Sequence, residues 1–315
     1  MSNTLYLVIP CYNEEEVLFE TASRLEKKFT ALIEQQIISE NSRIVFVDDG
    51  SWDDTWRIIL HLHEANEIFS GLKLSRNRGH QNALLAGLME VKHLCDYTIS
   101  MDADLQDDID VIDMFIEKYN LDNDIVYGVR GDRKSDTTVK RSTAQMFYHI
   151  MKKMGVETIF NHADCRLMSA RALDALSLYK ETNLFLRGIV PLIGFKCDTI
   201  EYSRSPRYAG LSKYPFKKML QLALNGITSF SITPIRIVTV TGTIIATLST
   251  FTLIVLALVT AFVQAVVSVL WIVTSVFLTC GLLMISIGIV GEYVGKIFEE
   301  TKARPRYIVD QFINK

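Results

Sequence analysis

The sequence predicts an α/β domain with a parallel sheet, followed by a part that crosses a membrane. Three observations lead to this class. Short apolar runs alternate with longer stretches of helical periodicity over residues 1–130. A polar cluster follows each of the first four apolar runs. Residues 237–291 carry no Asp, Glu, Lys or Arg, whereas residues 1–236 have the mixed charge of an ordinary water-soluble domain.

The alternation gives the expected elements in order. The expected strands are Leu5–Pro10, Arg43–Val47, Gly71–Leu74, Tyr97–Met101 and Asp124–Val129. The expected helices are Glu14–Gln35, Asp54–Asn66, Gln81–Leu94 and Ile109–Tyr119. A series of this kind forms a parallel sheet with helices on its faces, and its ligands bind outside the carboxyl ends of the strands.

The polar clusters fall at those carboxyl ends, which indicates one shared site. They are Pro10–Glu14, Asp48–Ser51, Arg76–Gly79 and Asp102–Asp108. The last cluster holds four carboxylates within seven residues, and each raises the cost of ionising its neighbours. A divalent cation, Mg²⁺ or Mn²⁺, would relieve that repulsion.

The oxygen ligands of such a cation can be ranked by their spacing. If strand geometry continues past Met101, Asp102 and Asp104 point to the same side, and Gln106 adds a neutral oxygen at the same period. Asp107 and Asp108 are expected to begin the next helix instead, where carboxylates complement the helix dipole.

The uncharged run predicts two transmembrane helices. A single helix of that length would extend roughly 82 Å, far beyond a hydrocarbon core of about 30 Å. We therefore expect spans at Ile237–Phe262 and Leu270–Val290, with a turn at Gln264–Ser268; one very long buried helix is the alternative. Lysines and arginines flank both outer ends, which predicts that the N-terminal domain and both termini are cytoplasmic. We expect a multi-pass protein of the inner (plasma) membrane.

The sequence is thus divided into four parts. They are a catalytic domain (1–214), a juxtamembrane amphipathic segment (215–236), the two spans (237–291) and a cytoplasmic C-terminal tail (292–315). Within the second part, Pro215–Ile227 has an apolar face at helical spacing, which predicts an interfacial helix. Small residues in the spans allow a homo-oligomer. We expect no nucleic acid partner.

Four segments together resemble one family. "VIPCYNEEE" (Val8–Glu16), "VDDGSWDDT" (Val47–Thr55), "LSRNRGHQNALLAGL" (Leu74–Leu88) and "MDADLQD" (Met101–Asp107) look like the successive motifs of family 2 glycosyltransferases, which have the A-type, Rossmann-like nucleotide-sugar-binding fold. With the two spans added, the chain resembles the polyprenyl-phosphate glycosyltransferases, the group of dolichyl-phosphate mannose synthase and the bacterial undecaprenyl-phosphate glucosyltransferases.

The resemblance implies roles for the residues of the donor side. Those expected to bind the donor nucleotide are Pro10, Tyr12, Asn13, Glu14, Asp49, Arg76 and Asp102, and those expected to hold the metal are Asp104 and Gln106, with Asp102 on either nucleotide or metal. Asp49 would contact the uracil edge and Arg76 the diphosphate. Helix capping is the alternative role of Asn13 and Glu14.

The resemblance also assigns the acceptor side. Asp164, in "NHADCRLMSARAL", is the candidate catalytic residue, either as base or as orienting group; a helix-start aspartate is the alternative. The expected ligands of the acceptor phosphate are Arg130, Arg141, Arg204, Arg207 and Lys213.

The implied reaction is an inverting transfer from a UDP-sugar to polyprenyl (undecaprenyl) phosphate. Glucose is the expected sugar, with N-acetylglucosamine next. A processive polysaccharide synthase is a rival, but it should contain a Gln-x-x-Arg-Trp segment, and none of Trp52, Trp56 and Trp271 follows an arginine. A non-catalytic membrane scaffold is the second rival.

Overall fold

The computed structural model describes residues 2–131, 162–182, 185–202 and 269–314, together with residues 235, 237–245, 247–248 and 251. The strands are β1 (Leu5–Cys11), β2 (Arg43–Asp48), β3 (Phe69–Leu74), β4 (Tyr97–Ser100), β5 (Ile125–Arg130), β6 (His162–Ser169), β7 (Cys197–Tyr202) and β8 (Val309–Ile313). The helices are α1 (Leu18–Glu34), α2 (Thr55–Ala65), α3 (His80–Val91), α4 (Val111–Tyr119), α6 (Ala170–Ser177), α7 (Leu186–Leu192) and α10 (Val269–Thr301). The predicted α/β class is confirmed, with shifts at the element ends.

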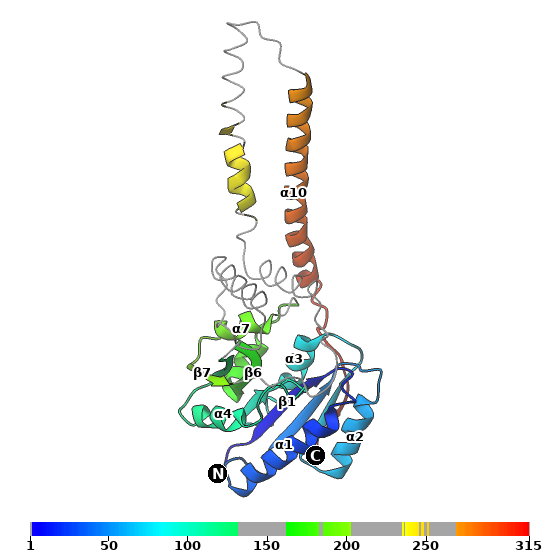
Figure 1. Cartoon of the computed structure of the whole chain (residues 1–315), viewed down its shortest axis with the longest axis vertical. Coiled ribbons are helices and arrows are strands. Elements are labelled where there is room, and N and C mark those ends of the chain that lie inside the picture. The colour runs from blue at the N-terminus through cyan, green and yellow to red at the C-terminus, as the bar shows by residue number, and fades with distance from the viewer. Residues whose placement is uncertain are drawn as a thin grey trace.

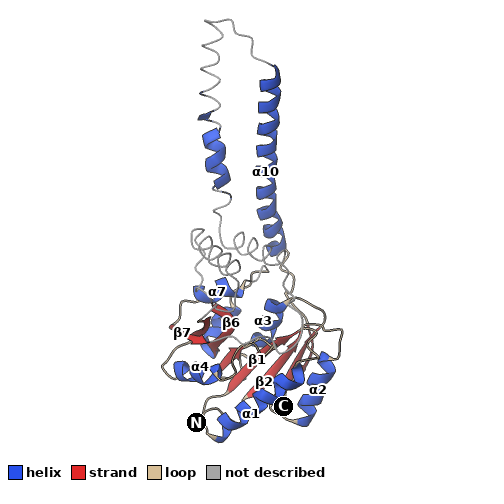
Figure 2. Cartoon of the chain, viewed as in Figure 1, coloured by secondary structure: helices blue, strands red, loops and turns tan. Residues whose placement is uncertain are grey.

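Helices cover both faces of the sheet (Figure 2). The two faces are visible in β1, which is buried along its whole length. Leu7 packs in the core shared with α1, α2 and α4, whereas Val8 packs in the core shared with α3, α6 and α7. Successive side chains of a strand point to opposite faces, so a central strand of a three-layer domain must be apolar throughout.

The sheet is mixed rather than parallel throughout. Within the described residues its strand order is β7-β5-β6-β4-β1-β2-β3-β8. The expected parallel pairing holds from β4 through β1 and β2 to β3. It fails at β5, because β6 lies between β4 and β5 and runs antiparallel to both. Ser100 pairs with Arg166, so β6 begins beside the carboxyl end of β4.

The prediction of two transmembrane helices is wrong. In the part of the chain that the structure describes, no helix combines the length and the apolar character that crossing a membrane requires. The absence of charged residues over 237–291 is a property of composition alone. The ends of the described helices do not coincide with the ends of that run. Residues 237–251 are described only in short pieces, and α10 runs past Val290 into turns that carry Glu292, Lys296 and Glu299. The multi-pass topology rested on those two spans and has no support from the described residues. The interfacial helix predicted at 215–227 lies outside the described residues.

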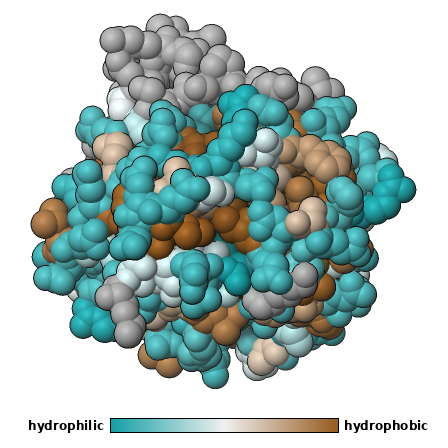
Figure 3. Space-filling model, turned by 90° about the horizontal axis from the view of Figure 1, so that it is seen from below, coloured by the Kyte–Doolittle hydropathy of each residue, from teal (hydrophilic) through white to brown (hydrophobic). Residues whose placement is uncertain are grey.

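The chain returns to the sheet after α10, which extends away from the α/β domain (Figure 1). Strand β8 pairs antiparallel with β3 and forms the edge of the sheet. Asn314 accepts a 2.7 Å hydrogen bond from the Ser70 hydroxyl. Both chain ends therefore lie on the α/β domain. Its face opposite α10 carries mostly hydrophilic side chains with smaller hydrophobic areas between them (Figure 3).

Candidate active site

The loops after β1 and β2 are joined into one wall of the site. The backbone N–H of Asn13 donates to the Ser51 hydroxyl at 3.0 Å, and the Asn13 side-chain oxygen accepts the Trp52 N–H at 3.1 Å. Asn13 has a φ of 53°, a left-handed conformation that asparagine tolerates better than most residues. The Glu14 N–H donates to the Thr55 hydroxyl at 2.9 Å. These contacts position the loop; they are not the helix caps considered above, since α1 begins only at Leu18.

The carboxylate of Asp49 organises the loop after β3. Its two oxygens accept the backbone N–H groups of Arg78 at 2.7 Å and Gly79 at 2.8 Å. Asp49 is buried, and burial raises the pKa of its carboxyl above the usual value despite both hydrogen bonds. The predicted contact of Asp49 with a uracil edge stays a prediction, but the structure gives this residue a further role in holding the loop.

Gly50 lets the two loops approach closely. Its φ is 66°, and a Cβ atom there would lie 2.6 Å from the carbonyl carbon of Arg76 and 2.6 Å from the nitrogen of Asn77. A larger residue would therefore push the loops apart. The Arg76 side chain is exposed at this rim, whereas Pro10 is buried in β1 and Tyr12 is half-buried beside it.

The acidic loop after β4 leaves strand geometry at once. β4 ends at Ser100, and Leu105 has a φ of 54°, so the alternation assumed for Asp102, Asp104 and Gln106 does not apply. Asp104 is 7% exposed and accepts the Gln106 N–H at 3.2 Å, while the Asp102 side chain is 26% exposed. The two carboxylates remain close in the chain at the edge of the sheet, with different access to solvent.

Asp107 and Asp108 do not begin a helix, because α4 starts at Val111. Asp107 is buried and accepts a 2.9 Å hydrogen bond from the hydroxyl of Tyr202, at the end of β7. Asp108 is exposed. Among the described side chains no group of three or more His, Cys, Asp or Glu forms a metal-binding cluster. Magnesium binding by one or two carboxylates together with substrate phosphates needs no such cluster, so Asp102 and Asp104 fit a substrate-borne cation.

Asp164 lies near the start of β6 and is held from two sides. The hydroxyl of Ser100, the last residue of β4, donates to the Asp164 carbonyl oxygen at 2.6 Å. Arg187, on α7, donates from Nε to Oδ1 at 3.0 Å and from Nη2 to Oδ2 at 2.9 Å. Burial alone would raise the pKa of Asp164, but the charge and hydrogen bonds of Arg187, with His80 and Arg166, lower it well below its usual range.

His80 lies between the acidic loop after β4 and Asp164. Its Nε2 atom is 3.7 Å from Oδ1 of Asp102 and 3.7 Å from Oδ2 of Asp164. This nitrogen is buried and has no hydrogen-bond partner among the described residues. Arg166, also on β6, is 3% exposed and places Nη2 3.8 Å from Oδ1 of Asp164. Three cationic or potentially cationic side chains thus face one carboxylate.

Sequence reasoning missed His80 and Arg187. His80 stood inside the quoted segment Leu74–Leu88, directly after Gly79, and its place at the start of α3 was a usable signal. Arg187 lies in a mainly apolar segment with no motif to mark it. Of the predicted acceptor ligands, Arg141, Arg204, Arg207 and Lys213 lie outside the described residues, and Arg130 is placed only as the last residue of β5.

A Rossmann-like sheet with carboxylates gathered at its carboxyl edge defines an α/β enzyme suited to a metal-bound nucleotide. Residues 6–177 match the model of the family described as Glycosyl transferase family 2, so the chain belongs to this family and is a glycosyltransferase.

Relatives extend the similarity beyond the matched domain. The chain is 50% identical over 311 residues to the uncharacterized glycosyltransferase YkoT of Bacillus subtilis (strain 168), covering 97% of this chain and 91% of that protein. It is 38% identical over 315 residues to the bactoprenol glucosyl transferase of Shigella phage SfX, covering 96% and 97%. A prophage bactoprenol glucosyl transferase homolog of Escherichia coli (strain K12) is 38% identical over 308 residues, covering 96% and 97%. The predicted relationship to polyprenyl-phosphate glycosyltransferases is confirmed.

Proposed function

We propose that this glycosyltransferase transfers glucose from UDP-glucose to a polyprenyl phosphate, with inversion at the anomeric carbon. The observation that carries the proposal is that Asp102, His80 and Asp164 lie together at the carboxyl end of β4. The His80 Nε2 atom is 3.7 Å from each of the two carboxylates. The acceptor class comes from the relatives named bactoprenol glucosyl transferase, which align along nearly the whole chain.

The chemistry requires little proton transfer. An oxygen of the polyprenyl phosphate attacks the anomeric carbon, and the bond from that carbon to the β-phosphate oxygen of UDP breaks, so UDP leaves with the electron pair. A phosphate monoester is already anionic near neutral pH. Asp164, ionised and held by Arg187, is therefore assigned to orienting and charge stabilisation rather than to proton removal.

A divalent cation, Mg²⁺ or Mn²⁺, would offset the charge of the departing diphosphate when it is bound. Asp102 and Asp104 are the residues that would hold it, with Gln106 beside them. Asp49 holds the loop of Arg76–Gly79 against the nucleotide side through the N–H groups of Arg78 and Gly79. Because the acceptor is a lipid, the reaction takes place at a membrane surface.

The test is a donor panel. Purified protein in detergent with undecaprenyl phosphate and Mg²⁺ is supplied in turn with radiolabelled UDP-glucose, UDP-N-acetylglucosamine and UDP-galactose. The expected result is a chloroform-soluble labelled product from UDP-glucose that releases glucose on mild acid treatment. If a lipid product formed faster from UDP-N-acetylglucosamine, the transferred sugar would be N-acetylglucosamine and not glucose. Release of free sugar without lipid product would refute the acceptor.

A further inference from the structure

The Asp164–Arg187 ion pair has geometry that a surface salt bridge rarely maintains. Two separate nitrogens of one guanidinium meet the two oxygens of one carboxylate, at 3.0 and 2.9 Å. The carboxylate is 21% exposed and the guanidinium 30%. Pairs of this forked kind constrain direction as well as distance, because the planar guanidinium matches the planar carboxylate.

The helix that carries Arg187 is tied to the helix that carries His80. The side-chain oxygen of Gln81, on α3, accepts the backbone N–H of Leu186, the first residue of α7, at 2.8 Å. Gln81 follows His80, and Leu186 precedes Arg187. One hydrogen bond therefore joins the two helices that carry His80 and Arg187, two of the three side chains that face Asp164.

The backbone of Asp164 is fixed independently. Its carbonyl oxygen accepts the Ser100 hydroxyl at 2.6 Å, and Ser100 stands two residues before Asp102. The main chain of Asp164 is thereby held against the donor loop, while the direction of its carboxylate is set by Arg187. His80 Nε2, which lacks a hydrogen-bond partner among the described residues, faces the oxygen that Arg187 Nη2 also contacts.

We propose that Arg187 is a positioning residue for the sugar transfer: it holds the Asp164 carboxylate toward His80 and the Asp102 loop, and Gln81 holds Arg187 in place. This inference rests on the proposed function, since it assigns Asp164 to the transfer step. Arg187 acts through Asp164, so its loss should change the turnover rate far more than donor affinity.

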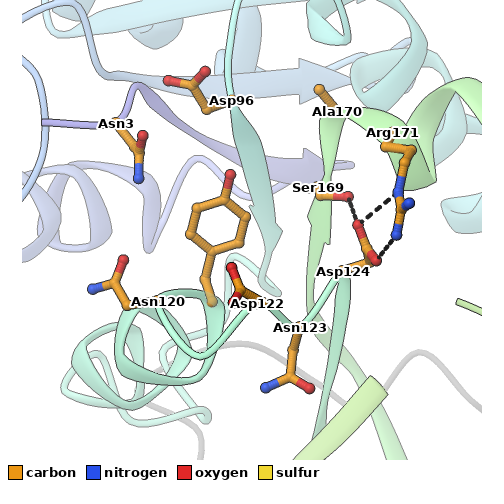
Figure 4. A pocket seen from close by; sticks show the side chains of 10 residues that line it. Asn3, Asp96, Asn120, Asp122, Asn123, Asp124, Ser169, Ala170 and Arg171 are labelled. Carbon is orange, nitrogen blue, oxygen red and sulfur yellow. Dashed lines mark hydrogen bonds and ion pairs between the residues drawn. The ribbon is translucent and has the colours of Figure 1, made fainter. Parts of the chain in front are cut away.

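A second ion pair in the molecule provides a matched control. Arg171, on α6, donates from Nε and Nη2 to the two carboxylate oxygens of Asp124. This pair lines a cavity of about 590 Å³ (Figure 4). The cavity lies near the amino end of β4, whereas Asp164 lies beside the carboxyl end of that strand. Breaking the pair removes an interaction of the same type without touching the site.

The experiment compares Arg187→Gln, Arg187→Lys and Gln81→Leu with Arg171→Gln. For each variant, kcat for lipid-linked sugar and the affinity for UDP with Mn²⁺ are measured on one preparation. Arg187→Gln should lower kcat about 100-fold, as expected for a misplaced active-site group, with UDP affinity within about twofold of wild type. Arg187→Lys should recover part of the rate, because the charge is restored without the fork. Gln81→Leu should fall between wild type and Arg187→Gln.

Three results would overturn the proposal. They are a kcat of Arg187→Gln within about threefold of wild type, an equal loss of UDP affinity and kcat, and an equal loss of kcat in Arg171→Gln. The double variant Asp164→Asn with Arg187→Gln gives a further check. When two residues act as one unit, removing the second costs little once the first is gone. The double variant should therefore be no more than about threefold slower than the slower single variant.

A substrate-free measurement separates this inference from the assignment of the reaction. Urea unfolding of wild type, Asp164→Asn, Arg187→Gln and the double variant yields the coupling between the two side chains. The expected coupling changes the unfolding equilibrium constant about fivefold or more. If Asp164 and Arg187 show no coupling, the positioning role of Arg187 is refuted even if glucose transfer is observed. Coupling in a protein that transfers no sugar would leave the ion pair in place and refute the proposed function instead.

Discussion

Asp49 and Gly79 are joined by a hydrogen bond of 2.8 Å from the glycine N–H to the aspartate Oδ2, beside a second bond of 2.7 Å from Arg78 to Oδ1. Asp49 follows β2, and Gly79 lies between β3 and α3, so the pair connects the loops after two neighbouring strands. The position of the loop after β3 therefore depends on one buried carboxylate.

Replacing Asp49 by Asn should loosen that connection. An amide has one acceptor oxygen, so one of the two backbone N–H groups would face an NH₂ group. The free energy of unfolding should fall by about 1–3 kcal/mol, the cost of an unsatisfied buried donor. Urea unfolding measures this. The control is Asp108→Asn, at an exposed position where the amide oxygen can still accept the Asp110 N–H. Equal stability of both variants would contradict the structural role of Asp49.

Asp104→Ala should abolish transfer, because the proposed cation loses a charged ligand. The hydrogen bond that Asp104 accepts from the Gln106 N–H contributes about 1 kcal/mol to the free energy of unfolding, so the variant should still fold. EDTA should stop the wild-type reaction, and added Mg²⁺ or Mn²⁺ should restore it. The exposed Asp108 serves as control, and its Ala variant should keep its rate. Turnover of Asp104→Ala within about twofold of wild type would exclude the metal role.

The ion pair of Asp164 should make the protein acid-sensitive. The pKa of Asp164 in the folded state is lowered, so its stabilisation is present above the ordinary aspartate pKa of about 4. Below that pH the unfolded chain binds a proton that the folded chain does not. The stability advantage of wild type over Asp164→Asn should therefore be present above about pH 4 and shrink by up to about 1.4 kcal/mol per pH unit below it. Unfolding curves on both sides of that pH test it. An advantage that stays constant down to pH 2 would contradict the assigned environment.

Strand β8 should be needed for the stability of the α/β domain. Ile313 packs against the core that contains Phe69, and it lies 3.1 Å from the position of a Cβ atom on Gly71. Ile313→Ala should lower the free energy of unfolding by about 1–3 kcal/mol, below the usual cost of a fully buried isoleucine because the site is half-buried. Gln311→Ala, on the same strand but exposed, should change it by less than about 0.5 kcal/mol. Equal effects of the two would show that β8 contributes no packing.

Much of the fold could be predicted because local patterns carry it. The run Leu5–Cys11 is apolar at both faces, which only a strand buried on two sides requires, and the structure buries it so. Boundaries were less secure. The expected helix from Glu14 begins at Leu18, and the N–H groups of Glu14 and Glu15 bond instead to the side chains of Thr55 and Asp53. The periodicity of one segment cannot show which distant segment its backbone groups will bond to.

The uncharged run at 237–291 shows where composition misleads. The run differs in composition from residues 1–236, but composition specifies no helix ends. The helix α10 continues through Glu292 and Lys296, and the segment after it returns to β3 as an antiparallel strand. An edge strand of five residues beyond a long helix leaves almost no local signal.

The sequence by itself determined the alternation of strands and helices, the family motifs and the polar residues at the carboxyl ends of β1 to β4, because these depend on neighbours within a few positions. Only the tertiary structure decided that β6 runs antiparallel beside β4, which places Asp164 next to Asp102 through the Ser100–Arg166 pairing. It also decided that Arg187 and His80 face that carboxylate. Strand direction and the docking of α7 on α3 are set by packing between segments distant in the chain. That information is absent from any local pattern.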